Sequence, residues 1–109
     1  MISEKEINIV RKILHSTPAE YRPIRAYIYG SRARGDAEDY SDLDILVELD
    51  RPVDRTIKNS LRHVAWELSI EHGFVISVAI VAKDDFEHGA LAKSGFACNI
   101  RKEGVVIAA

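Results

Sequence analysis

Apolar residues return at helical spacing in two long stretches of the 109-residue chain. Near the N-terminus, Ser3 and Glu6 form a capping box, and the pattern that follows predicts a helix over roughly residues 4–16. A second and longer stretch lies between Asp54, a suitable N-cap, and Gly73, a suitable C-cap. Its apolar positions form one stripe, which predicts an amphipathic helix packed against a core. The stripe consists of Ile57, Leu61, Val64, Ala65 and Leu68.

Runs of β-branched and aromatic residues predict strands over residues 24–29, 43–49 and 74–82. The third run is almost continuously apolar, as in a strand at the centre of a sheet whose two faces are both covered. Because predicted strands and helices alternate, the order of elements favours an α/β fold. Shorter helical segments are expected over residues 31–37, 84–88 and 90–102, and a brief last strand over 105–107.

The composition predicts one soluble domain spanning residues 1–109, with 47% hydrophobic and 29% charged residues. The net charge of −2 and the absence of basic blocks argue against bulk binding to nucleic acid. Cys98 is the only cysteine, so no internal disulfide can form, as expected for a cytoplasmic protein. The longest apolar run is too short to span a membrane. A chain of this size has no room for a separate substrate-holding domain, so we expect a partner protein.

The residues that suggest chemistry lie between the first two predicted strands. Gly30 closes the first strand, and Ser31 begins the segment after it, so backbone amides and a hydroxyl can receive an anion such as a phosphate. Asp42 and Asp44 are two positions apart on the second predicted strand, with Cα atoms roughly 6.5–7 Å apart and both carboxylates on one face. Two such carboxylates can hold a pair of Mg²⁺ ions, as in two-metal phosphoryl-transfer sites.

Each part of this region also has a simpler interpretation. Ser41 and Asp44 have the spacing of a capping box, although the β-rich residues after them argue against a helix start. Arg32 and Arg34 are either phosphate contacts or surface charges paired with nearby acids such as Asp36. The glycine–serine pair together with the acid pair is what favours the functional interpretation.

Written out, the pattern is Gly30-Ser31-x-Ala33-x-Gly35, then five residues, then Ser41-Asp42-x-Asp44. This pattern, within a strand–helix–strand order, resembles the minimal nucleotidyltransferase family of the DNA polymerase β-like nucleotidyltransferase superfamily. The resemblance covers most of the chain, but only the motif region is diagnostic. It implies an α/β (α+β) nucleotidyltransferase-like fold, in which a small mixed β-sheet is flanked by helices.

The resemblance also implies roles for individual residues. The triphosphate of ATP or another NTP is bound by a nucleotide-binding group, and two Mg²⁺ ions are held by a catalytic acid pair. The nucleotide-binding group is Gly30, Ser31, Arg32 and Arg34, and the catalytic and metal-binding pair is Asp42 and Asp44.

One position departs from the family pattern. Active members carry a third carboxylate on the next strand, where it helps to hold the catalytic metal and activates the attacking hydroxyl, and here that strand offers Ser77. A hydroxyl is a poorer Mg²⁺ ligand than a carboxylate and is not its acid–base equivalent. Glu48 shares the face of the acid pair but lies too far along the strand to replace the missing group.

Two functions therefore stay open. The first is Mg²⁺-dependent transfer of a nucleoside monophosphate, AMP from ATP in the expected case, to a hydroxyl of a protein or small molecule. In prokaryotes, family members of this size are often the antitoxins of all-helical HEPN proteins, which makes such a protein the expected partner. The alternative is a catalytically impaired nucleotide-binding module that neutralises the same kind of partner by direct binding, and the serine at position 77 favours it.

Overall fold

Four strands form a single mixed sheet in the computed structural model, which describes residues 2–109. The strand order is β3-β2-β1-β4. β1 pairs antiparallel with both β2 and β4, whereas β2 and β3 are parallel neighbours joined through a helix. The strands are β1 (Pro23–Tyr29), β2 (Leu43–Leu49), β3 (Ile76–Ala82) and β4 (Val105–Ala108).

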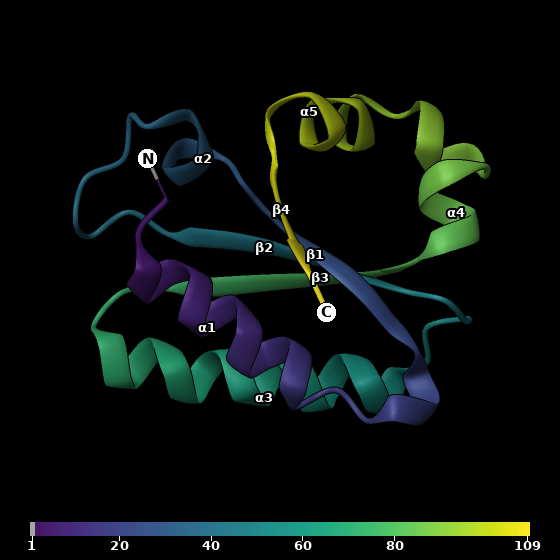
Figure 1. The fold of residues 1–109 in the computed structure, drawn as a ribbon, viewed down its shortest axis with the longest axis horizontal. Coiled ribbons are helices and arrows are strands. Elements are labelled where there is room, and N and C mark those ends of the chain that lie inside the picture. The colour runs from purple at the N-terminus through teal and green to yellow at the C-terminus, as the bar shows by residue number, and fades with distance from the viewer. Residues whose placement is uncertain (1) are drawn as a thin grey trace.

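Helices cover the two faces of this sheet unequally (Figure 1). The long helices α1 and α3 lie together on one face, and the short helices α2, α4 and α5 lie on the other. This arrangement is the mixed sheet flanked by helices that the sequence predicts. The helices are α1 (Glu4–His15), α2 (Ser31–Arg34), α3 (Arg55–His72), α4 (Lys83–Glu87) and α5 (Gly95–Glu103), with 3-10 turns at Ala19–Tyr21 and Ala90–Lys93.

Both long helices begin and end where the sequence predicts. The capping box at the start of α1 is present, with the Ser3 hydroxyl accepting from the Glu6 amide and the Glu6 carboxylate accepting from the Ser3 amide. Asp54 caps α3 by accepting from the Ile57 amide at 2.9 Å, and Gly73 ends the helix with a φ of +80°. These caps satisfy terminal backbone groups and fix where the two helices begin and end.

The main core lies between those two helices and the sheet. Val10 and Ile13 of α1 and Leu61 of α3 are 0% exposed, and they pack in one cluster with Leu43, Ile45 and Val47 of β2. Burying each such side chain contributes about 1.5–3 kcal/mol. The alternate residues of β2 therefore face the opposite side of the sheet, and these include Asp44.

Two predicted elements are wrong in part. The apolar run at 74–82 was expected at the sheet centre, but β3 begins at Ile76 and is an edge strand. One of its faces packs in the main core and the other is only partly buried, against α4 and α5. Sequence alone does not reveal an open edge. The helix expected over 90–102 is two elements, because Ser94 takes an extended conformation and caps α5 by accepting from the Ala97 amide.

The second face of the sheet is covered only in part. A smaller apolar cluster joins Tyr27 and Leu46 to Phe86, Ala97 and Ile100 of α4 and α5. On β2, Glu48 and Leu46 are fully buried on this face, whereas Asp44 is partly exposed. The uncovered end of the face is therefore the end that carries the acidic residues.

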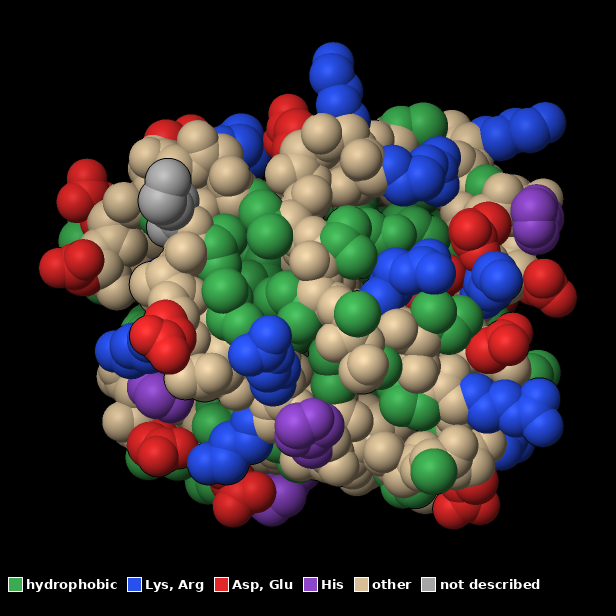
Figure 2. Space-filling model, viewed as in Figure 1, with side chains coloured by type: hydrophobic (Ala, Val, Ile, Leu, Met, Phe, Trp, Pro, Cys, Tyr) green, Lys and Arg blue, Asp and Glu red, His purple; other side chains and the backbone are tan. Residues whose placement is uncertain are grey.

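β4 forms the other edge of the sheet. Figure 2 shows hydrophobic side chains gathered in the middle of this face of the molecule, around the position of β4, with charged side chains mostly toward the periphery. Val106 is 55% exposed there.

Among residues 2–109, no helix is both long enough and apolar enough to cross a membrane.

Candidate active site

Gly30 forms a sharp bend between β1 and α2. Its φ of +76° and ψ of −156° lie in a region that is essentially restricted to glycine. A Cβ atom at this position would also lie 2.5 Å from Oδ2 of Asp44. The glycine therefore brings the backbone at the start of α2 against the acidic side chain of the neighbouring strand.

The two acids occupy different backbone environments. Asp44 is inside β2, where it lies opposite Tyr29 of β1 and Ser77 of β3. Asp42 was expected on the strand, but β2 begins at Leu43, so Asp42 belongs to the end of the preceding loop and is exposed. Sheet pairing thus fixes Asp44 on both sides, whereas near Asp42 it holds only the peptide that leads to Leu43, whose amide donates to the Val75 carbonyl at 2.9 Å.

The negative charge of the acidic pair is only partly compensated. Burial raises the pKa of Asp44, and the nearby negative charge of Asp42 raises it further, while Arg34 partly offsets both effects. Neither acid forms an ion pair with a basic side chain in the described part of the chain. A bound cation would relieve this repulsion, and carboxylate oxygens are the ligands that Mg²⁺ prefers.

Two acids, Asp42 and Asp44, lie at this point in the described part of the chain. Within residues 2–109, no group of three His, Cys, Asp or Glu side chains is placed to hold a metal ion. Ser77 lies beside Asp44 in the β2–β3 register, at the position where a third carboxylate was sought. Glu48 is buried further along β2 and pairs with Arg25 at 3.2 Å, so it serves another part of the fold.

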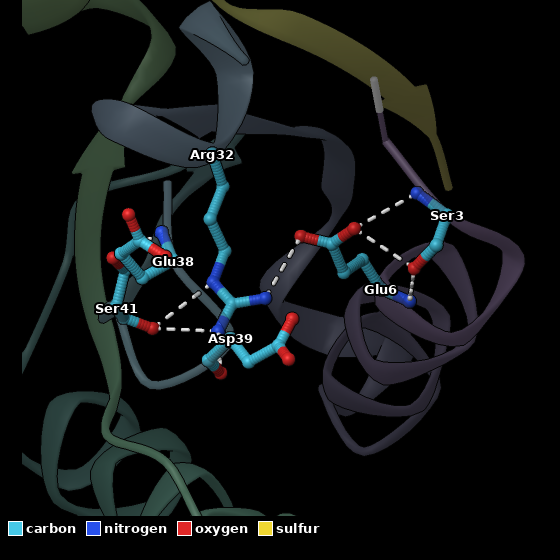
Figure 3. Close-up of polar contacts among 6 residues, drawn as sticks. All are labelled: Ser3, Glu6, Arg32, Glu38, Asp39 and Ser41. Carbon is cyan, nitrogen blue, oxygen red and sulfur yellow. Dashed lines mark hydrogen bonds and ion pairs between the residues drawn. The ribbon is translucent and has the colours of Figure 1, made fainter. Parts of the chain in front are cut away.

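The two arginines of α2 point in different directions. The Arg34 side chain is 46% exposed, pairs with Asp36 at 3.3 Å and with Glu103 at 3.9 Å, and lies close enough to Asp44 to affect its pKa. The Arg32 side chain is only 11% exposed and binds the loop before β2 and the first turn of α1 (Figure 3). Arg34 is therefore the arginine whose charge acts on Asp44.

Sequence reasoning missed two residues around this site. Glu6 was identified only as a helix cap, although its second carboxylate oxygen pairs with Arg32 at 3.3 Å. Tyr29 was identified only as a strand residue, yet it lies beside Asp44, and its ring packs edge-to-face on Phe96 with centroids 5.6 Å apart. Burial and the charge of Asp44 raise the pKa of Tyr29. Only the alternation of β1 signals that Tyr29 faces this side.

The mixed sheet, the glycine bend after β1 and the acids at the start of β2 define the class of fold, which is nucleotidyltransferase-like. The sequence model of the nucleotidyltransferase domain matches residues 7–106. The chain therefore belongs to the nucleotidyltransferase domain family, as its motif predicts. Comparison with curated proteins finds no match.

Solved structures share this fold at low sequence identity. One is a crystal structure of a toxin–antitoxin with AMP-PNP, with a TM-score of 0.59 and 19% identity, in which 92% of this chain aligns with 70% of that chain. Another is a mutant of the toxin–antitoxin MntA-HpeT, with a TM-score of 0.58 and 16% identity, covering 98% of this chain and 72% of that one. At these identities the likeness concerns the fold.

Proposed function

We propose that the chain binds a nucleoside triphosphate with Mg²⁺ and transfers its nucleoside monophosphate to a hydroxyl group, with AMP from ATP as the expected transfer. The observation that carries the proposal is the approach of the Gly30 bend to Asp44, whose pKa is raised by burial and by the charge of a second acid, Asp42. The family membership and a fold shared with a protein crystallised with AMP-PNP support a nucleotide ligand.

Each residue has a defined task in this proposal. Gly30 and Ser31 receive the phosphates, because the first amides of a helix have no intrahelical acceptor. Arg34 contacts the phosphate tail, and Asp42 and Asp44 hold the metal. When bound, a pair of Mg²⁺ ions supplies charge stabilisation for the attacking and leaving oxygens. In the transfer, the acceptor hydroxyl loses its proton to the solvent and its oxygen forms a bond to the α-phosphorus. The bond from that phosphorus to the pyrophosphate oxygen breaks, and pyrophosphate leaves.

The acceptor is proposed to be a partner protein. The family resemblance and the toxin–antitoxin complexes that share the fold point to an all-helical HEPN-type toxin, with this chain as the cytoplasmic antitoxin. The test is to purify the chain with the protein encoded beside it and to add Mg²⁺ and ATP labelled on the α-phosphate. The expected result is a label on the partner that is lost in both Asp42→Ala and Asp44→Ala.

A second function has one observation in its favour. Ser77 stands beside Asp44, where a carboxylate would accept the proton of the attacking hydroxyl. We propose as the alternative a nucleotide-binding module that neutralises the partner by contact alone. Neutralisation that survives both aspartate substitutions, with no transfer of label, supports this alternative and contradicts the transferase.

A further inference from the structure

The Arg32 guanidinium is held from several sides. Its Nε and Nη2 donate to the Ser41 carbonyl at 3.0 and 2.6 Å, and Nη2 also donates to the Asp39 carbonyl at 3.0 Å. Its Nη1 donates to Glu6 Oε2 at 3.3 Å. Figure 3 shows the side chain reaching from α2 between the loop and the start of α1. Arg32 therefore joins three segments of the chain.

The partners of Arg32 are themselves fixed. Glu6 is 7% exposed, and its other oxygen accepts from the amide and hydroxyl of Ser3, each at 2.8 Å. The Phe74 ring, which precedes β3, lies 4.2 Å from the guanidinium carbon. Carboxylate pairing and stacking on an aromatic ring both orient a planar guanidinium. The cation that reaches the loop is therefore anchored to the folded body of the protein.

This anchoring bears directly on Asp42. A peptide unit is planar, so fixing the Ser41 carbonyl also fixes the nitrogen and Cα atom of Asp42. Asp42 precedes β2 and lacks the sheet pairing that holds Asp44. The peptide after Asp42 is held by the Leu43 amide, which donates to the Val75 carbonyl at 2.9 Å. The two hydrogen bonds from Arg32 to the Ser41 carbonyl hold the peptide before it.

We propose that Arg32 is a positioning residue, which aims the Asp42 carboxylate at the metal by holding the Ser41–Asp42 peptide against Glu6 and Phe74. The inference rests on the proposed function of the acid pair and assigns Arg32 to that pair's geometry, with Arg34 as the phosphate contact. Supporting groups of this kind typically change metal affinity by about 10- to 100-fold.

The test measures Mn²⁺ affinity in the presence of AMP-PNP, by the paramagnetic signal of the ion. Arg32→Gln is expected to weaken Mn²⁺ binding by about 10-fold or more. Asp42→Asn is expected to weaken Mn²⁺ binding much less in the Arg32→Gln variant than in the wild type, because the Asp42 carboxylate is already misplaced in that variant. Asp44→Asn keeps its full effect in both backgrounds. Arg32→Lys is not expected to restore Mn²⁺ affinity, because a single ammonium group cannot replace the several N–H donors of the planar guanidinium.

The control is Arg51→Gln, which also removes a guanidinium that donates to a backbone carbonyl, that of Glu20, and lies over an aromatic ring, Tyr21. It is expected to leave Mn²⁺ affinity unchanged. If Arg32→Gln fails to fold, Glu6→Gln keeps the helix cap, removes the charge that anchors Arg32, and should weaken binding in the same sense.

Three results overturn the inference. Wild-type affinity in Arg32→Gln, or in a folded Glu6→Gln used in its place, shows that the anchor does not matter. Additive losses in the double variant with Asp42→Asn show that Arg32 acts elsewhere. Absence of Mn²⁺ binding in the wild type contradicts the proposed function and this inference together. The first two results contradict this inference alone, because the wild type binds Mn²⁺ in both.

Discussion

At the scale of single residues, the site depends on one contact between a glycine and an acid. Gly30 has a backbone conformation closed to other residues, and the space for its side chain is taken by the Asp44 carboxylate. The sequence placed this glycine at the end of a strand, but it could not show which side chain the backbone would approach.

Gly30→Ala is expected to disrupt the fold locally and the site specifically. The positive φ costs about 1–3 kcal/mol of the free energy of unfolding, and the added methyl group pushes the Asp44 carboxylate away. The control is Gly73→Ala, which has a similar φ of +80° but meets no atom within 4 Å. Denaturant unfolding should show a lower free energy of unfolding in both variants, and calorimetry should show a loss of nucleotide binding in Gly30→Ala alone.

Asp44→Asn is expected to stabilise the metal-free protein at neutral pH while it abolishes metal binding. Because the pKa of Asp44 is raised in the folded protein, its ionised form opposes folding. The stability that the protonated carboxyl contributes is present at low pH and is lost as the pH rises through the folded pKa. The stability gap between variant and wild type should therefore be small below the ordinary value of 3.8 and widen toward pH 7. Thermal unfolding across this range measures it.

Asp50→Asn is the control for this experiment, because Asp50 is exposed just beyond the other end of β2. Its substitution should leave both stability and metal binding almost unchanged. An Asp44→Asn protein that is less stable than the wild type at pH 7 would contradict the proposed repulsion between the two acids.

The arginines show a limit of sequence reasoning at this scale. Arg32 and Arg34 are equivalent as letters in the motif, and each was a candidate for phosphate binding or surface pairing. Their roles separate only when the 35–42 loop folds back, because Arg32 then meets the Ser41 carbonyl and Glu6. A contact across 26 positions, such as that from Arg32 to Glu6, leaves no local signal in the sequence.

At the scale of elements, periodicity predicted most of the fold. The limits of β2 and the caps of α3 were correct, because alternation and capping are local properties. The position of β3 at the sheet edge was not predictable, since it follows from the order in which strands pair. The register of β3 on β2 places Ser77 beside Asp44, and the assignment of this position to a third carboxylate stays a prediction.

Ser77→Asp is expected to supply a third carboxylate to the proposed metal site. Because position 77 faces the same side as Asp44 on a paired neighbour, the new acid can share the metal and accept a proton from the acceptor hydroxyl. Transfer of labelled AMP should rise by about 100-fold or more. The metal-free variant should be less stable, because three acids then repel one another.

Ser77→Asn is the matched control, with a similar shape and no charge. It should leave the transfer rate close to that of the wild type. A transfer rate that is equal in Ser77→Asp and Ser77→Asn would show that the serine is not what limits the chemistry.

At the scale of the whole molecule, one face of the sheet forms the main core and the other carries the candidate site. α1 and α3 bury one face in the main core, and α4 and α5 cover only part of the other, which leaves the acids partly open. Composition predicts that a hydrophobic core is present, but it does not predict which face of the sheet is buried and which is left partly open. That residues 1–109 act as one domain with a protein partner stays a prediction.

The most direct test of the account is calorimetry of AMP-PNP binding to the purified chain, with and without Mg²⁺. The wild type is expected to bind the nucleotide in a manner that depends on Mg²⁺, and Asp44→Asn is expected to lose that dependence, because the site joins a phosphate cradle to an acid pair. If the folded wild type binds neither ligand, or if Asp44→Asn binds Mg²⁺ and AMP-PNP as well as the wild type, the proposed site is contradicted.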